Sequence, residues 1–206
     1  MVQIATAQRR PAASPAADAR RREILAAASA AFRRKGLAAT GMREIAAETG
    51  MTAGNLYYYF RSKQELLAFC QETTVDALLA EAQSIAAEEL GAAEKLRRAI
   101  VAHVVCLNET YPGSLAHLEI EALEPGRREP LARRRKQYER VIANFVAAGV
   151  ASGELVPRDP GLVARALLGA LNWTVKWFSA EGEKSASEVG GELAALFLDG
   201  LARRAA

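Results

Sequence analysis

One segment of the chain combines side chains that suit contact with a polyanion. It spans Thr52–Phe60 (TAGNLYYYF), contains the consecutive tyrosines Tyr57–Tyr59, and is followed by Arg61 and Lys63. Three adjacent tyrosines do not all fit a core, because each buried hydroxyl needs a hydrogen-bond partner. Hydroxyls beside two cations instead suit a surface that lies against phosphates. If Leu56 packs inward, the tyrosines and the residues before them face outward.

Other reactive side chains are few. His103 with Cys106, and His117 with Glu121, would share predicted helix faces and could bind a metal ion, but no recognised zinc spacing is present. The chain also lacks a glycine-rich phosphate loop and a nucleophile elbow. The sequence therefore predicts a protein that is not an enzyme and holds no cofactor. A metal-sensing or small-molecule-binding helical dimer, an enzyme, or an interaction protein without a ligand cavity are the alternatives.

The chain beyond residue 18 has the pattern of helices throughout. Apolar residues recur at three- and four-residue spacing, as in Ile24–Phe32, and no segment alternates like a strand. Pro112–Gly113 and Pro125–Gly126 mark breaks between helices. The sequence predicts an all-α fold of about nine helices, at roughly 19–35, 42–48, 53–59, 63–89, 92–109, 113–122, 127–151, 160–180 and 186–204.

Two short helices joined by a glycine-containing turn are expected between Thr40 and Phe60. Thr40 or Gly41 is suited to cap the first, Gly50 to form the turn, and Thr52 to cap the second. Such a pair with an apolar inner face is what a DNA-binding helix-turn-helix requires. The geometry alone is a weak signal, because many helical hairpins have a glycine turn and never contact DNA.

Basic charge is concentrated in the first third of the chain. Residues 1–63 carry eleven Lys and Arg against four Asp and Glu, whereas residues 64–206 carry sixteen against twenty. This asymmetry indicates that one end meets a polyanion, although arginines that only solubilise the chain would give the same count. Residues 1–18, with Pro11 and Pro15, are predicted to form a flexible basic arm. That arm and Arg20–Arg22 could reach DNA or make no specific contact.

The distribution of apolar residues along the chain also bears on the cellular location. No apolar run approaches the length needed to cross a bilayer, and the first residues lack the hydrophobic stretch of a signal peptide. Cys70 and Cys106 lie in apolar helical stretches and form no disulfide framework. The sequence predicts a cytoplasmic protein without a membrane partner.

One stretch closely resembles the N-terminal domain of TetR-family regulators. It covers residues 24–67, ILAAASAAFRRKGLAATGMREIAAETGMTAGNLYYYFRSKQELL. Gly41 departs from the family, which usually has a second Ser or Thr there. The resemblance implies a helix-turn-helix domain over 19–63 and an effector-binding and dimerisation domain over 64–206, in a ligand-responsive transcriptional repressor. The matching positions are Ile24–Leu25, Phe32, Gly36, Thr40, Ile45–Ala46, Gly50, Leu56–Tyr57, Tyr59–Phe60, Lys63 and Leu66–Leu67.

The resemblance implies individual roles in DNA binding. Arg43 matches a position that can reach a guanine edge. Ala53 suits contact with a thymine methyl, and Asn55 suits contact with a base or a phosphate. Phosphate contacts are expected from Thr40, which would also cap its helix, and from Tyr57, Tyr58 and Lys63. The expected DNA-binding residues are Thr40, Arg43, Thr52, Ala53, Gly54, Asn55, Tyr57, Tyr58 and Lys63.

The resemblance also implies how the rest of the chain is used. The last two helices are expected to pack against a second copy, so that a homodimer reads a palindromic double-stranded DNA operator; packing within one chain is the alternative. The middle helices are expected to enclose an effector cavity, although each candidate residue also suits ordinary packing. The candidates are His103, Leu107, Asn108, Tyr111, His117, Glu121, Tyr138, Phe145, Asn172, Trp173 and Trp177.

The penultimate helix resembles a subset of the family that senses acyl-CoA thioesters. Asn172–Trp173 and Trp177–Phe178 carry the likeness. It implies a small hydrophobic or acyl-CoA-like effector that releases the repressor from DNA. The basic run Arg133–Lys136 could meet the phosphates of coenzyme A, or could form a solvated helix face.

Overall fold

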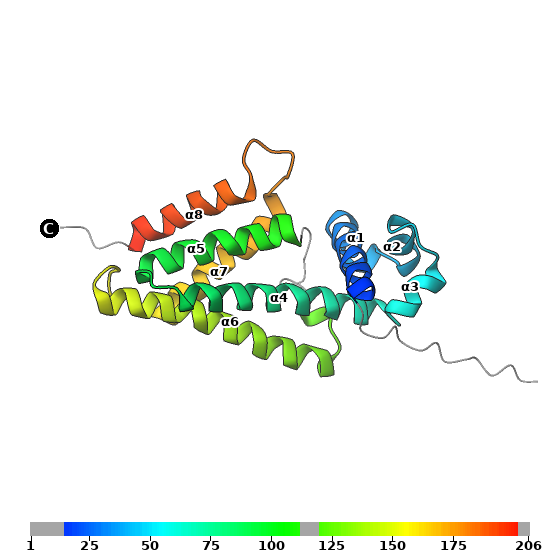
Figure 1. The fold of residues 1–206 in the computed structure, drawn as a ribbon, viewed down its shortest axis with the longest axis horizontal. Helices are drawn as coiled ribbons and strands as arrows, with labels where there is room; N and C mark the ends of the chain where they lie inside the picture. The colour runs from blue at the N-terminus through cyan, green and yellow to red at the C-terminus, as the bar shows by residue number, and fades with distance from the viewer. Residues whose placement is uncertain (1–14, 112–119, 202–206) are drawn as a thin grey trace, which may run out of the picture.

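The computed structural model describes residues 15–111 and 120–201. Over these ranges the chain forms helices and no β-strand, which confirms the all-α fold class. The helices are α1 Pro15–Ala39, α2 Met42–Glu48, α3 Ala53–Tyr59, α4 Lys63–Ala87, α5 Ala92–Val105, the π-helical turn η1 Cys106–Thr110, the 3-10 turn η3 Ile120–Ala122, α6 Pro125–Ser152, α7 Pro160–Trp177 and α8 Ala186–Leu201 (Figure 1).

The molecule is elongated, with a small helical unit at one end. Figure 1 shows α1, α2 and α3 grouped there and the bundle of α4 to α8 at the other end. Helix α4 begins beside the small unit and continues into the bundle, where it packs against α5 and α6. A single helix therefore connects the two parts.

The first helix is kinked near its end at a glycine with an unusual backbone. Gly36 has φ 79° and ψ 160°, a conformation that residues with a Cβ rarely adopt without strain. The hydroxyl of Thr40 then donates to the carbonyl of Gly36 at 2.8 Å, which fixes the path of the chain into α2. The start of α1 differs from the prediction, because the helix begins at Pro15 and not near residue 19. Proline is tolerated in a first helical turn, where its missing N–H has no helical partner.

The core of the small unit is continuous with α4. Leu56 of α3, Phe60 just after it and Ile24 of α1 are fully buried. The guanidinium of Arg21 lies over the rings of Phe60 and Phe69, 5.0 and 4.6 Å from their centres. These contacts join α1 and the end of α3 to the first turns of α4.

In the bundle, α5 lies in the centre and packs most extensively against α8. Gly190 of α8 makes this approach possible, since an added Cβ there would lie 2.9 Å from the Cα of Val101. Helix α6 begins at Pro125, two residues before the predicted start, and α7 ends at Trp177 and not near residue 180. Of the helix expected over 113–122, only Ile120–Ala122 falls within the described residues. None of the described helices has the length and apolar character needed to cross a membrane.

Candidate DNA interface and ligand pockets

The α2–α3 pair has the geometry of a helix-turn-helix. Helix α2 buries Met42, Ile45 and Ala46, and Gly50, at φ 63°, forms the turn into α3. The side-chain oxygen of Thr52 accepts a hydrogen bond from the Asn55 N–H at 3.2 Å. The predicted cap of α3 is thus confirmed, and it fixes where the helix begins.

The outer face of this pair presents polar and aromatic side chains. Arg43 of α2 and Asn55 of α3 are exposed, and neither of their side chains forms a hydrogen bond or ion pair with a described residue. Tyr57 and Tyr58 are also exposed, at 46% and 38% of their surface. Gly54 is exposed beside them, and Ala53 is half-buried. The face therefore offers hydrogen-bonding groups that are not used inside the protein.

Two of the residues expected to contact phosphates serve the fold. Thr40 is 1% exposed, and its hydroxyl donates to the carbonyls of Gly36 and Ala31. Gly41, the second of the two residues expected to cap α2, occupies its N-cap position, and Thr40 does not. The expected contact of Thr40 with a phosphate stays a prediction. The Lys63 ammonium donates to the carbonyls of Leu37 and Thr40 at 2.8 and 3.2 Å. Its expected role as a phosphate clamp stays a prediction.

Arg20 lies beside α3. Its guanidinium donates to the Thr49 carbonyl at 3.0 Å and pairs with Glu23. A hollow of ≈ 350 Å³ opens next to it, and its wall includes Arg20, Gly50, Met51, Asn55, Tyr58 and Tyr59. The sequence pointed to Arg20 only as one of three arginines that could reach DNA; the fold places it next to Asn55 and Tyr58.

His103 is the centre of a buried polar cluster in the bundle. Its Nδ1 lies 3.0 Å from the hydroxyl of Tyr138, and its Nε2 lies 3.1 Å from Oδ1 of Asn172. Burial lowers the pKa of His103 to about 4, so the ring is neutral near pH 7. Because the Asn172 carbonyl oxygen can only accept, Nε2 carries the proton and Nδ1 accepts from Tyr138.

This cluster makes stability depend on pH. The folded-state pKa of His103 lies below its ordinary value of 6.5, so the unfolded chain binds more protons as the pH falls. We expect the free energy of unfolding to fall between pH 6.5 and 5, by up to about 1.4 kcal/mol per pH unit. Chemical denaturation across this range measures it. His103→Asn should flatten the dependence while His117→Gln, at the only other histidine, retains it; an unchanged slope in His103→Asn would contradict the assignment.

Next to the cluster is a small cavity between α6 and α7, here called the α6–α7 pocket. Its volume is ≈ 270 Å³. Val75 and Leu168 give it apolar walls, and Gly169 leaves one side open. The lining residues are Val75, His103, Arg135, Tyr138, Glu139, Arg165, Leu168, Gly169 and Asn172.

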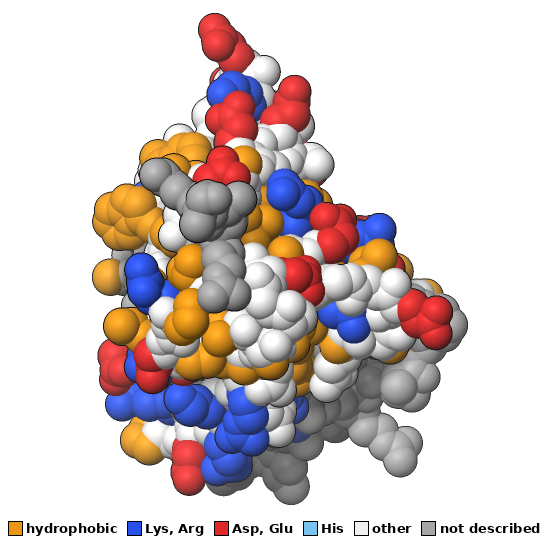
Figure 2. Space-filling view, turned by 90° about the vertical axis from the view of Figure 1, so that its left-hand side faces the viewer, with side chains coloured by type: hydrophobic (Ala, Val, Ile, Leu, Met, Phe, Trp, Pro, Cys, Tyr) orange, Lys and Arg blue, Asp and Glu red, His pale blue; other side chains and the backbone are white. Residues whose placement is uncertain are grey.

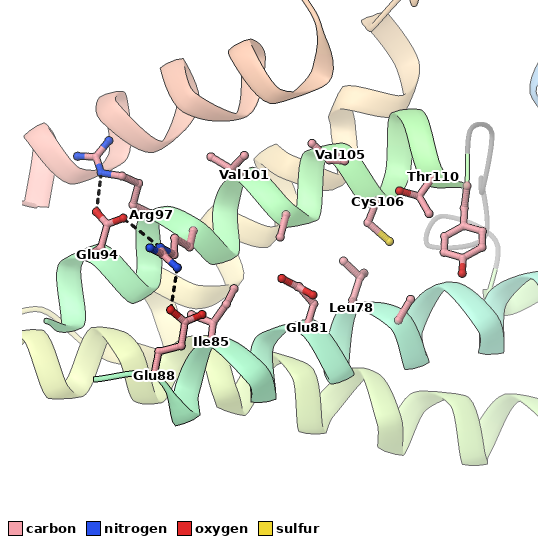
Figure 3. Close-up of a pocket in the computed structure, with 14 residues that line it drawn as sticks. Leu78, Glu81, Ile85, Glu88, Glu94, Arg97, Val101, Val105, Cys106 and Thr110 are labelled. Carbon is pink, nitrogen blue, oxygen red and sulfur yellow. Dashed lines mark hydrogen bonds and ion pairs between the residues drawn. The ribbon is translucent and has the colours of Figure 1, made fainter. Parts of the chain in front are cut away.

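A larger cavity of ≈ 640 Å³, the α4–α5 groove, runs between these two helices (Figure 3). One end is closed by ion pairs, in which Arg98 bonds Glu88 at 2.7 Å and Glu94 at 3.3 Å. Glu81 points from α4 into the middle, and the other end reaches Thr110. The lining residues are Ala77, Leu78, Glu81, Ile85, Glu88, Glu94, Arg97, Arg98, Val101, Ala102, Val105, Cys106, Thr110 and Tyr111.

The predicted effector residues are divided among several environments. Three of them, His103, Tyr138 and Asn172, line the α6–α7 pocket, and Tyr111 lines the α4–α5 groove. The other predicted effector residues that the structure describes line neither of these two cavities. Leu107, Asn108 and Phe145 are buried in the core, Glu121 pairs with Arg128 on the surface, Trp173 and Trp177 are exposed, and His117 lies outside the described residues.

The basic run on α6 is mostly neutralised by neighbours. Arg133 pairs with Glu129, Arg134 with Asp76 and Lys136 with Glu139. Arg135 instead turns inward, bonds Gln71 at 3.3 Å and reaches the α6–α7 pocket. The sequence pointed to Arg135 only as part of the basic run that could meet coenzyme A phosphates, and it missed Arg165 as a lining residue. For Arg135 the available signal was its spacing of three residues from Tyr138 on one helix face.

Helix α7 carries an exposed apolar stripe. The stripe consists of Leu162, Ala166, Gly169, Trp173 and Trp177, which recur every three or four residues and are all exposed. On α8, Leu196 is 68% exposed. Figure 2 shows hydrophobic side chains gathered along one side of the bundle's end, above a band of Lys and Arg. Large apolar side chains in such a row indicate an interaction surface.

Comparison with known proteins decides the family. Residues 24–69 match the family model for bacterial regulatory proteins of the tetR family, and residues 89–201 match the model for the tetracyclin repressor-like C-terminal domain. The chain belongs to the TetR family. Its members are DNA-binding transcriptional regulators and not enzymes, so the α2–α3 pair is the DNA-binding helix-turn-helix of a regulator.

Several relatives are similar to this chain in sequence or structure over more than four fifths of its length. The HTH-type transcriptional repressor KstR2 of Mycolicibacterium smegmatis is 28% identical over 177 residues, which are 82% of this chain and 84% of KstR2. Among solved structures, PfmR of Thermus thermophilus is 31% identical with a TM-score of 0.78, over 87% of this chain and 99% of PfmR. KstR2 of Mycobacterium tuberculosis is 26% identical with a TM-score of 0.80, over 97% and 100%.

Proposed function

We propose that the chain is a homodimeric repressor that a small molecule releases from operator DNA. The observation that carries the DNA contact is the outer face of α2 and α3, where Arg43 and Asn55 offer unused hydrogen-bonding groups beside Tyr57 and Tyr58. Such groups suit base edges in a major groove, with tyrosine hydroxyls on the flanking phosphates. Residues 19–63 act as the DNA-binding domain, 64–206 as the effector and dimerisation domain, and 1–18 as a basic arm.

Dimerisation is supported by the apolar stripe on α7. Trp173 is 57% exposed and Trp177 52%, an arrangement that leaves large apolar surface in water unless a second copy covers it. Two copies paired through α7 and α8 would place two α3 helices on one face of DNA. A palindrome with half-sites one helical turn apart is the matching operator. A regulator with this task acts in the bacterial cytoplasm, where the DNA lies.

Release by an effector is supported by the α4–α5 groove and the α6–α7 pocket. A ligand that binds one conformation of the bundle better than another shifts the population of both, and operator affinity changes by linkage. Helix α4 is suited to pass on such a change, because it lines both cavities and begins directly after the helix-turn-helix. A small hydrophobic or acyl-CoA-like molecule is the effector class we propose. AibR, which shares the fold at 23% identity and a TM-score of 0.74, was solved with isovaleryl coenzyme A and operator DNA.

The test is a titration of the full chain on its own promoter DNA by gel shift, at stated salt, with unrelated DNA as the control. We expect binding to the promoter at least a thousandfold tighter than to unrelated DNA at the same salt. Adding an acyl-CoA series should then release the DNA at a ligand concentration that also raises the melting temperature. Equal affinity for both DNAs would overturn the operator proposal. Specific binding that no acyl-CoA or hydrophobic compound releases would overturn the effector proposal alone.

A further inference from the structure

The α4–α5 groove and the α6–α7 pocket differ in the charge that they offer a ligand. The α4–α5 groove is lined by Glu81, Glu88 and Glu94 against Arg97 and Arg98, and both arginines pair with carboxylates. Its net charge is negative, and Glu81 lies in the middle of the apolar walls (Figure 3). An anionic group placed there would meet a carboxylate without a free cation to offset it.

The α6–α7 pocket has the opposite balance. It is lined by Arg135 and Arg165 against the single carboxylate of Glu139. That carboxylate already accepts from Lys136 at 3.0 Å and lies 3.4 Å from Arg165. The net charge of the pocket lining is therefore positive. Arg135, which is half-buried, places its positive charge close to the apolar walls.

The buried cluster behind the pocket determines which hydrogen-bonding groups face it. The carbonyl oxygen of Asn172 accepts from His103 Nε2, so the Asn172 amide N–H groups are left for the pocket. The hydroxyl of Tyr138 donates to His103 Nδ1 and offers only lone pairs to a ligand. Neutral His103 adds no charge. The donors facing the pocket are then one amide and two guanidinium groups, a set that matches carboxylate or phosphate oxygens.

We propose that the α6–α7 pocket binds the anionic head of the effector, a carboxylate or a phosphate attached to an apolar chain. Val75 and Leu168 provide the apolar contact for the first carbons of that chain. At ≈ 270 Å³ the pocket is smaller than the roughly 300–1,000 Å³ of a complete drug-sized site, so it holds a head group and not a whole acyl-CoA. This inference rests on the proposed function for its regulatory meaning but not for the binding itself.

The pocket and the proposed dimer surface share residues of α7. Gly169 lines the pocket and also belongs to the apolar stripe, and Asn172 precedes Trp173 of the stripe. An anion held by Asn172 and Arg165 would pull on α7 at the surface proposed to meet a second copy. Ligand binding and dimer geometry are therefore expected to be linked.

The experiment is a calorimetric titration of the full chain without DNA. The probes are decanoate, decyl phosphate, decanol and decyltrimethylammonium, which share one chain length and differ in the head. We expect one or both anions to bind at least tenfold tighter than decanol, with the cation weakest. Arg135→Gln and Arg165→Gln should each lower the affinity for the anion by roughly tenfold, because each removes a charge-assisted hydrogen bond. Decanoate binding would identify a carboxylate as the head, and binding of decyl phosphate alone would identify a phosphate.

Two variants serve as matched controls. Arg134→Gln removes an arginine next to Arg135 that pairs with Asp76 outside the pocket, and Glu81→Gln removes a charge from the other cavity. Both should bind the anions within twofold of the unmodified chain. Equal affinity for the cation, failure of all four probes, or an unchanged anion affinity in both pocket variants would overturn the proposal. Because no DNA is present, loss of operator binding would leave this result standing and would count only against the proposed function.

Discussion

Trp173→Glu should convert the protein from a dimer into a monomer. The substitution places a carboxylate in the middle of the apolar stripe, where a second copy would bury it without a partner. Burial of an unpaired charge costs several kcal/mol, so the dimer dissociation constant should rise at least about a hundredfold. Sedimentation velocity over a range of protein concentrations measures this directly. Operator affinity should fall with it, because a monomer contacts one half-site only.

A matched variant separates this effect from a general effect of charge. Asn144→Glu adds the same charge at an exposed position on α6, outside the stripe, and should remain dimeric. The melting temperature of Trp173→Glu, measured at low concentration where the unmodified chain is also monomeric, reports on folding alone. A dimer of unchanged affinity in Trp173→Glu would mean that the stripe is not the interface.

Arg43→Ala should weaken operator binding by about ten- to a hundredfold and relax the preference for one base pair. This corresponds to a loss of about 1–3 kcal/mol of binding free energy. The exposed guanidinium is the one long cation on α2 or α3 among the described residues, and its bidentate geometry fits a guanine edge. Tyr57→Ala should weaken binding to all sequences alike, because a phosphate contact carries no base identity. Titration against a set of operators with single base changes distinguishes the two outcomes.

The control for this pair is an exposed arginine far from the helix-turn-helix. Arg140→Ala, on α6, should bind the operator as the unmodified chain does. If Arg43→Ala and Tyr57→Ala both left the affinity unchanged, the assignment of the DNA face would be wrong. If Arg43→Ala weakened every operator equally, Arg43 would contact phosphate and not a base.

Local features of the helix-turn-helix could be predicted because short-range physics decides them. The Thr52 cap and the Gly50 turn depend on residues within one turn of the chain. Thr40 and Lys63 could not be predicted in this way. Their polar groups are bound to carbonyls at the end of α1, and only the packed arrangement of α1, α2 and α4 brings those groups together. A polar residue in a DNA-binding motif can serve the fold first.

The bundle is harder to predict because its sites combine distant helices. The pairing of His103 with Asn172 spans 69 residues, and nothing local indicates it. The two tryptophans of α7 were expected in a cavity, yet their spacing places them on the exposed stripe. Aromatic type alone does not distinguish a pocket wall from an interface; which side of α7 faces the core decides it. Arg135 shows the converse, since one member of a basic run turns inward while its neighbours pair on the surface.

The central claim is that two copies of the chain read one palindrome through α3. Hydroxyl-radical footprinting of the full chain on its own promoter tests it most directly. We predict two protected patches related by dyad symmetry, with centres about one helical turn apart, that appear together as the protein concentration rises. A single patch without symmetry, or protection that spreads evenly along the DNA, would contradict the claim.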